Sequence, residues 1–128
     1  MKKILLFLTV LALFSCRQES IEERAERDAR ETTAKRCPIR MSDDGTLIME
    51  RITFDKSTRT WCQDFLQDID PEVLKEANYR DLLLQELKNI PSYKPYMDNG
   101  FTFRYVFCNM KNPKDTLVDV RLTPEDYR

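Results

Sequence analysis

The chain begins with an apolar block and then becomes highly charged. Lys2 and Lys3 precede residues 4–14, which are apolar except for one threonine. A helix that spans a bilayer needs about 20 apolar residues, so this block is too short to be a comfortable membrane span. Its length and its basic start are typical of the apolar core of a secretory signal, which is removed after export.

The segment that follows the block, residues 19–36, is rich in charge. Within it Ile21, Ala25 and Ala29 recur at helical spacing. This pattern predicts either a thin amphipathic helix or a solvated tether between the start of the mature chain and a folded domain. Pro38 ends the segment, because the residue before a proline is pushed out of the helical conformation.

Four stretches with strand-like patterns follow, in two pairs. Residues 46–54 and 58–66 are rich in β-branched and aromatic residues around a short polar break, and they predict a hairpin. Residues 101–110 give the clearest strand, because aromatic residues alternate strictly with other residues. A turn is expected at 112–115, followed by a fourth strand at 116–122. The alternating aromatic residues are Phe101, Phe103, Tyr105 and Phe107.

Between the two pairs of strands, residues 71–89 predict a helix. Asp70 suits the N-cap, Pro71 fits the first helical position, and Glu72 lies beside the positive end of the helix dipole. Asn78 is expected to mark a local break in this helix. Its apolar stripe is expected to pack in the core and consists of Val73, Ala77, Leu83, Leu84, Leu87 and Ile90. The last residues of the chain are expected to form one helical turn.

The order of these elements predicts a small α+β domain: helix, strand, strand, helix, strand, strand. We expect a signal at residues 1–15, a charged tether or helix at 16–36, and a domain at 37–128 with helices packed on a four-stranded sheet. The helix between the second and third strands returns the chain, so these two strands are expected to be parallel and the first strand antiparallel to both.

The apolar block ends in Leu13-Phe14-Ser15-Cys16, which resembles the lipobox of a bacterial lipoprotein signal. The resemblance implies that Cys16 is acylated and becomes the first residue of the mature chain, anchored by several acyl chains to a membrane. Arg17 follows instead of the aspartate that signals inner-membrane retention, which favours the outer membrane of a Gram-negative bacterium. The alternative is an ordinary secretory signal that stops at a cysteine.

Composition excludes several classes of function. The chain contains no histidine and two glycines, which excludes Ser-His and Cys-His nucleophile pairs, histidine metal sites and glycine-rich phosphate loops. Without residues 1–15, 19 basic residues stand against 22 acidic ones, a formal charge of −3, and no basic stripe suits nucleic acid. A carboxylate pair of the glycosidase type has no specific signal among so many acids. We expect no enzyme activity, cofactor or metal.

Three cysteines remain once Cys16 is acylated, namely Cys37, Cys62 and Cys108. The absence of C-x-x-C argues against a thioredoxin-like site and against tetrahedral zinc. An exported chain meets an oxidising compartment. The expected strand directions place Cys37 level with Cys108, which makes this pair the candidate disulfide, and reduced buried cysteines are the alternative.

Short motifs of the mature chain resemble a group of small exported bacterial proteins, many of them lipoproteins, whose function is unknown. The resemblance implies a similar fold and an envelope location, and it implies no activity. The motifs are Cys37-Pro38, Thr46-Leu47-Ile48, Phe103-Arg104-Tyr105 and Thr123-Pro124-Glu125-Asp126.

Export, a tether and the lack of a catalytic constellation together predict a lipid-anchored envelope protein that binds or supports an envelope protein or ligand. The alternative is a small inhibitor or immunity-type protein that presents an edge strand or a loop to an envelope enzyme. The candidate partner-binding residues are Tyr93, Tyr96 and Met97, because aromatic residues dominate interface hot spots. The same tyrosines would otherwise pack within their own loop.

Overall fold

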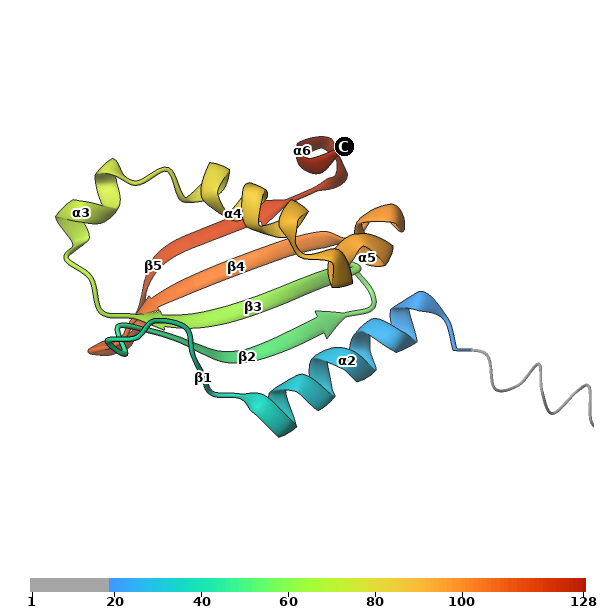
Figure 1. Ribbon diagram of the computed structural model, residues 1–128, viewed down its shortest axis with the longest axis horizontal. Helices are drawn as coiled ribbons and strands as arrows, with labels where there is room; N and C mark the ends of the chain where they lie inside the picture. Colours follow the sequence, from blue (N-terminus) through green and yellow to red (C-terminus); the bar gives the residue numbers. More distant parts are fainter. Residues whose placement is uncertain (1–18) are drawn as a thin grey trace, which may run out of the picture.

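The computed structural model describes residues 19–128, so the apolar block and Cys16 lie outside the described residues. The described chain forms one five-stranded sheet with helices along it (Figure 1). The strands are β1 (Ile39–Arg40), β2 (Leu47–Asp55), β3 (Thr60–Gln67), β4 (Thr102–Asn109) and β5 (Asn112–Leu122). The helices are α2 (Ile21–Arg36), α3 (Pro71–Glu76), α4 (Tyr79–Asn89), the short 3-10 turn η1 (Pro91–Tyr93), α5 (Lys94–Asp98) and α6 (Pro124–Tyr127).

The strands lie in the sheet in sequence order, from β1 to β5. The pairs β2–β3 and β4–β5 are antiparallel, whereas β3 and β4 are parallel. These directions confirm the expectation from the sequence. The sheet has five strands rather than the predicted four, because Ile39 and Arg40 pair with Met49 and Ile48 at the edge. Two residues are too few to produce a recognisable pattern in the sequence.

The strand β5 begins earlier than predicted. Residues 112–115 belong to the strand, and the chain reverses at residues 110–111, where Asn109 Oδ1 accepts a hydrogen bond from the backbone N–H of Lys111 at 3.0 Å. The predicted turn is therefore wrong. Pro113 is tolerated there because β5 is an edge strand, which does not need every backbone N–H for pairing.

Helix α2 packs on the sheet and is part of the folded domain. Ala25 and Ala29 are 0% and 2% exposed. Thr33 Oγ1 donates a hydrogen bond to the carbonyl of Ile52 and accepts one from its N–H, each at 2.9 Å. The side chain thus provides hydrogen-bond partners for the backbone of β2 where the short strand β1 does not reach. The sequence left a helix and a tether open for this segment, and its described part is a helix. The predicted domain boundary after Arg36 separates α2 from the sheet on which it packs.

The helix predicted after β3 is divided at Asn78 into α3 and α4, as expected. Asn78 Oδ1 accepts a hydrogen bond from the N–H of Asp81 at 3.3 Å and thereby caps α4. Leu83 and Leu87 are buried on the side of α4 that faces the sheet, at 9% and 0% exposed, whereas Leu82 is 61% exposed. The predicted core position is confirmed for Leu83 and Leu87, and Leu84 packs partly buried against the same core. It is wrong for Val73, which is 53% exposed.

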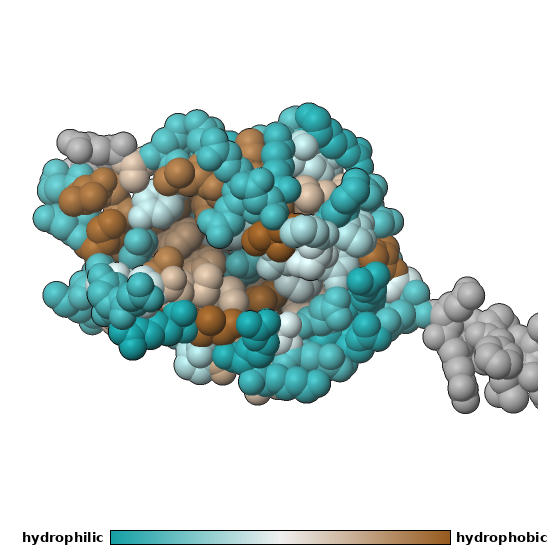
Figure 2. Space-filling view, viewed as in Figure 1, coloured by the Kyte–Doolittle hydropathy of each residue, from teal (hydrophilic) through white to brown (hydrophobic). Residues whose placement is uncertain are grey.

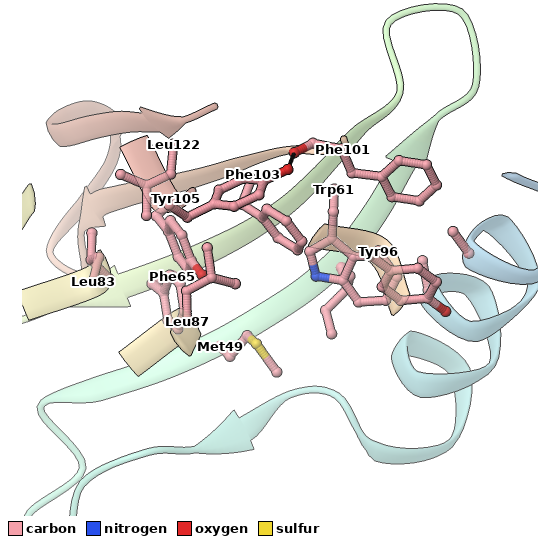
Figure 3. Close-up of a cluster of buried hydrophobic side chains, with 14 of the residues drawn as sticks. Met49, Trp61, Phe65, Leu83, Leu87, Tyr96, Phe101, Phe103, Tyr105 and Leu122 are labelled. Atoms are coloured by element: carbon pink, nitrogen blue, oxygen red, sulfur yellow. Dashed lines mark hydrogen bonds between the residues drawn. The ribbon is translucent and has the colours of Figure 1, made fainter. Parts of the chain in front are cut away.

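The main core lies between the inner face of the sheet and the helices (Figure 3). Phe65 and Phe107, from the parallel pair of strands, stack with ring centroids 4.6 Å apart. Tyr96 of α5 stacks on Trp61 and on Phe101, with both centroid distances at 5.3 Å. The predicted burial of the alternating aromatic residues in β4 and just before it is confirmed, since all four are at most 5% exposed.

Candidate binding groove

Helices α2 and α4 lie along opposite sides of the inner sheet face and leave a groove between them. Two adjoining hollows of about 420 and 320 Å³ form it, and they share Met41, Met49 and Tyr93. Figure 2 shows apolar and intermediate side chains at the centre of this view, between more hydrophilic surfaces. The groove is lined by Asp28, Glu31, Thr32, Arg36, Ile39, Met41, Leu47, Met49, Ile52, Trp61, Gln63, Phe65, Leu83, Glu86, Ile90, Ser92, Tyr93, Tyr105 and Phe107.

Inward-facing residues of the strands form the floor of the groove. Met49 of β2 and Phe65 of β3 are neighbours in the register, and both are 6% exposed. Met41, which follows β1, stands at the lip and is 47% exposed. An apolar floor with a methionine at its lip suits a binding surface, because methionine adapts to irregular apolar partners.

One polar pair fixes the wall of the groove. Gln63 points inward from β3 and is 7% exposed, and its Nε2 donates a hydrogen bond to the hydroxyl of Tyr93 at 3.0 Å. A tyrosine hydroxyl is protonated at neutral pH, and burial raises the pKa of Tyr93 further. The pair holds the Tyr93 ring against Trp61, with the ring centroids 5.6 Å apart.

The rim of the groove is mainly acidic. Its lining includes Asp28 and Glu31 from α2 and Glu86 from α4, against Arg36 as the one lining cation. Asp28 accepts a hydrogen bond from Tyr96 and lies near two arginines of α2. Neither Glu31 nor Glu86 forms an ion pair with any residue of the described range 19–128. The groove therefore presents an apolar floor and negative charge above it.

The candidate partner-binding residues of the sequence do not form an exposed patch. Tyr96 is 3% exposed and packs in the core, and Met97 is partly buried against it. Burial and the hydrogen bond to Asp28 raise the pKa of Tyr96. Tyr93 alone of the three lines the groove. The alternative, in which the tyrosines turn inward, is closer to the structure, but their ring partner is Trp61, a residue distant in the chain, rather than their own loop.

The structure does not bring Cys37 and Cys108 together. Cys37 precedes β1 at one edge of the sheet, and Cys108 lies in β4, with β2 and β3 between them. Three strand spacings amount to about 14 Å, well beyond the Cα separation of about 7 Å that a disulfide tolerates. All three cysteines of the described chain are free, and burial raises the pKa of Cys62 to about 11.

Hydrogen bonds lower the pKa of several carboxyl groups in the described chain. Hydrogen bonds from Thr46 and Ser42 lower the pKa of Asp44 to about 2, and two hydrogen bonds from Arg104 lower the pKa of Asp119. A general acid needs a raised carboxyl pKa. Within residues 19–128, no group of three or more histidine, cysteine, aspartate or glutamate side chains is placed to hold a metal ion. No helix in this range is long and apolar enough to cross a bilayer.

A family model for a domain of unknown function, DUF8479, matches residues 20–118. The chain belongs to the DUF8479 family. The matched part of this DUF8479 chain starts at the N-cap of α2 and reaches into β5, so it contains every residue that lines the groove. No curated protein matches the chain in sequence.

Several solved structures share the fold of this DUF8479 chain. A Pseudomonas aeruginosa protein assigned as secreted superposes with a TM-score of 0.71 at 13% identity, and the match covers 87% of this chain and 100% of that one. The pilotin of the Vibrio vulnificus type II secretion system gives 0.61 at 17% identity, covering 84% and 91%. The type II secretion pilotin of Vibrio cholerae gives 0.57 at 18% identity, covering 82% and 90%. At these identities the likeness shows a common fold.

Proposed function

We propose that this DUF8479 protein is a lipid-anchored, non-catalytic protein of the Gram-negative cell envelope that binds a segment of a partner protein in the groove. The observation that carries this proposal is the groove itself. Its floor leaves part of an aromatic core accessible, as partner-binding sites do. Its acidic rim complements a partner segment that is apolar on one side and carries lysine or arginine beside the apolar residues.

The fold neighbours support an envelope role. Two of them are pilotins of type II secretion systems, and a third is assigned as a secreted protein. A domain of this shape therefore serves in envelope assemblies of other bacteria. By analogy, the partner of this protein is a component of an envelope assembly, and the alternative partner is an envelope enzyme that the protein inhibits.

The anchor is proposed at Cys16, with the outer membrane as its location. The full-length protein and a Cys16→Ser variant, expressed in a Gram-negative host, separate the two readings of the signal. Acylation adds the mass of the acyl chains and moves the wild type into detergent, and the variant gains neither property. Equal processing and release of both forms would contradict the anchor.

The groove is tested with a photo-cross-linking residue at position 41, since Met41 stands exposed at the lip. In cells, we expect an adduct with an envelope protein, attached at an apolar segment that carries basic residues. A double variant with Glu31→Lys and Glu86→Lys reverses the charge of the rim, and it is expected to lower the adduct about tenfold or more.

Two controls make this experiment specific. Asp115→Lys reverses an exposed charge on β5, outside the groove, and should leave the adduct unchanged. A probe at Leu82, on the exposed side of α4, should give no such adduct. An adduct of equal yield in the rim variant would contradict groove binding. An adduct with an enzyme whose activity falls on binding would identify the protein as an inhibitor.

A further inference from the structure

We propose that one end of the protein docks on an anionic phospholipid bilayer, and that a hollow between α4, α5 and α6 receives a phospholipid headgroup there. The end concerned is the one that carries the N-terminus of α2, and it is called the proximal end below. This inference rests on the proposed acylation of Cys16, and it adds a second contact with the membrane beside the anchor.

A series of contacts defines the proximal end (Figure 1). Arg59, in the turn between β2 and β3, has its Nε 3.1 Å from a carboxylate oxygen of Glu22 in the first turn of α2. The same side chain donates from Nη2 to the carbonyl of Asn99 at 2.6 Å, and Arg128 Nη2 lies 3.5 Å from the carbonyl of Asp98. The start of α2, the end of α5 and residue 128 are therefore neighbours.

The anchor places this end close to the bilayer. Ser20, the N-cap of α2, lies four residue steps after Cys16 in the chain. A fully extended chain spans at most about 3.6 Å per residue, so Ser20 lies within about 14 Å of the acylated residue. The opposite end lies one strand length away, about 26 Å for the eight residues of β4. The tether thus selects the end of the protein that meets the membrane.

The hollow at the proximal end has the chemistry of a phospholipid site. Its volume is about 440 Å³, and Lys88, Lys94 and Arg128 stand around it. Asp98 is the one carboxylate side chain in its lining, 3.7 Å from Lys94. Basic groups attract the anionic lipids of a membrane surface, and arginine and lysine both bind phosphate. The apolar part of the lining, which suits the glycerol and upper acyl region, comes from Ile90, Pro91, Met97 and Tyr127.

Charge distinguishes this hollow from the groove. The rim of the groove carries Asp28, Glu31 and Glu86 beside Arg36, and an anionic surface would repel it. The side chains that line the hollow carry three positive charges and one negative charge, and the latter, on Asp98, lies beside Lys94. The same protein therefore offers an acidic surface for a basic protein segment and a basic surface for phospholipid, and the membrane does not compete for the groove.

The experiment compares the acylated full-length protein in two kinds of vesicle, phosphatidylcholine alone and phosphatidylcholine with about 30% phosphatidylglycerol. An amine-reactive reagent labels the lysines, and mass spectrometry measures each site. We expect labelling of Lys88 and Lys94 to fall about threefold or more in the anionic vesicles, because bound headgroups cover them. Labelling of Lys111 and Lys114, in the turn and strand at the opposite end, should not change.

A matched pair of variants tests the charge. With Lys94→Glu, labelling of Lys88 should return toward its level in phosphatidylcholine, whereas Lys114→Glu should leave the protection of Lys88 intact. The acyl mass on Cys16 is measured in the same samples. Acylated protein with equal Lys88 labelling in both vesicles, or with equal protection at both ends, overturns the docking surface and leaves the anchor standing. Absence of the acyl mass overturns the anchor and, with it, this inference.

Discussion

The inner face of the sheet is covered by helices in one half and carries an open groove in the other. In the half near the start of α2, helices α5 and α6 cover the sheet, and both Phe101 and Phe103 are 0% exposed. In the other half, Met49 and Phe65 belong to the same core but line a groove that α2 and α4 leave between them. Met41 at its lip is 47% exposed.

The two halves differ because segments next to β4 and β5 in the chain cover only one of them. The closed half is covered by α5, which leads directly into β4, and by α6, whose Tyr127 hydroxyl donates to the carbonyl of Phe101 at 2.7 Å. Only a further segment above the floor would close the groove half, and residues 19–128 place none there. We therefore expect changes in the closed half to lower stability and changes at the groove lip to lower binding.

The largest effect is expected from Phe103→Ala in the closed half. Phe103 is fully buried, and its ring contacts those of Tyr93 and Tyr127 at centroid distances of 5.8 and 6.0 Å. Loss of a buried phenylalanine ring leaves a cavity and costs about 3–5 kcal/mol. Urea unfolding monitored by circular dichroism measures the change. A loss below about 1 kcal/mol would show that this half is not closed as described.

A smaller effect is expected where α2 forms the wall shared by both halves. Thr33→Val keeps the shape of the side chain and removes both hydrogen bonds to the backbone of Ile52. Two part-buried backbone groups then lose their partner, which costs about 1–2 kcal/mol in unfolding free energy. Thr32→Val, one residue earlier and without such a bond in the described chain, is the control. Equal effects of the two variants would contradict the edge role of Thr33.

Tyr96→Phe removes the hydroxyl that donates to Asp28 and should cost about 1 kcal/mol at neutral pH. Burial first, and then the hydrogen bond and charge of Asp28, raise the pKa of Tyr96 in the folded state. An acid whose pKa is raised by folding contributes stability below its unfolded pKa, near 10, and loses that contribution as pH rises above this value. Unfolding curves from pH 8 to 11 should therefore bring wild type and variant together at high pH. A constant difference over this range would argue against the bond.

The smallest change in stability is expected at the groove lip. Met41→Ser alters a side chain that is half exposed, so the free energy of unfolding should change by less than about 0.5 kcal/mol. The variant should nevertheless weaken the association of the purified protein with the partner that the cross-link identifies. Leu82→Ser, on the outer side of α4, should change neither quantity. If Met41→Ser lowered stability and left binding unchanged, the groove lip would be a structural element rather than a binding surface.

Local signals in the sequence predict much of the fold. The aromatic alternation before and within β4 locates that strand and its buried side, and Asn78 marks the division between α3 and α4. The helical segment between β3 and β4 predicts that these strands are parallel. Each of these features depends on residues that are close together in the chain, where periodicity and capping act directly.

The features that the sequence did not predict depend on lateral position in the sheet. Strand directions place Cys37 and Cys108 at comparable heights, but two intervening strands separate them. The groove arises because α2 and α4 lie apart on one sheet face, which no local pattern encodes. Met49 and Glu86, for example, are ordinary residues for a strand and a helix. They line the same groove only because the fold brings β2 and α4 together.

The parallel contact between β3 and β4 has a consequence for the order of folding. The pairs β2–β3 and β4–β5 are joined by short turns, so each hairpin forms from local contacts, on a time scale of about 1–10 μs for an isolated hairpin. Thr60 meets Thr102 only after the chain that contains α3, α4 and α5 has closed into a loop. Closing a long loop is entropically expensive and slows folding. We therefore expect the two hairpins to form first and the parallel contact between β3 and β4 to form late in folding.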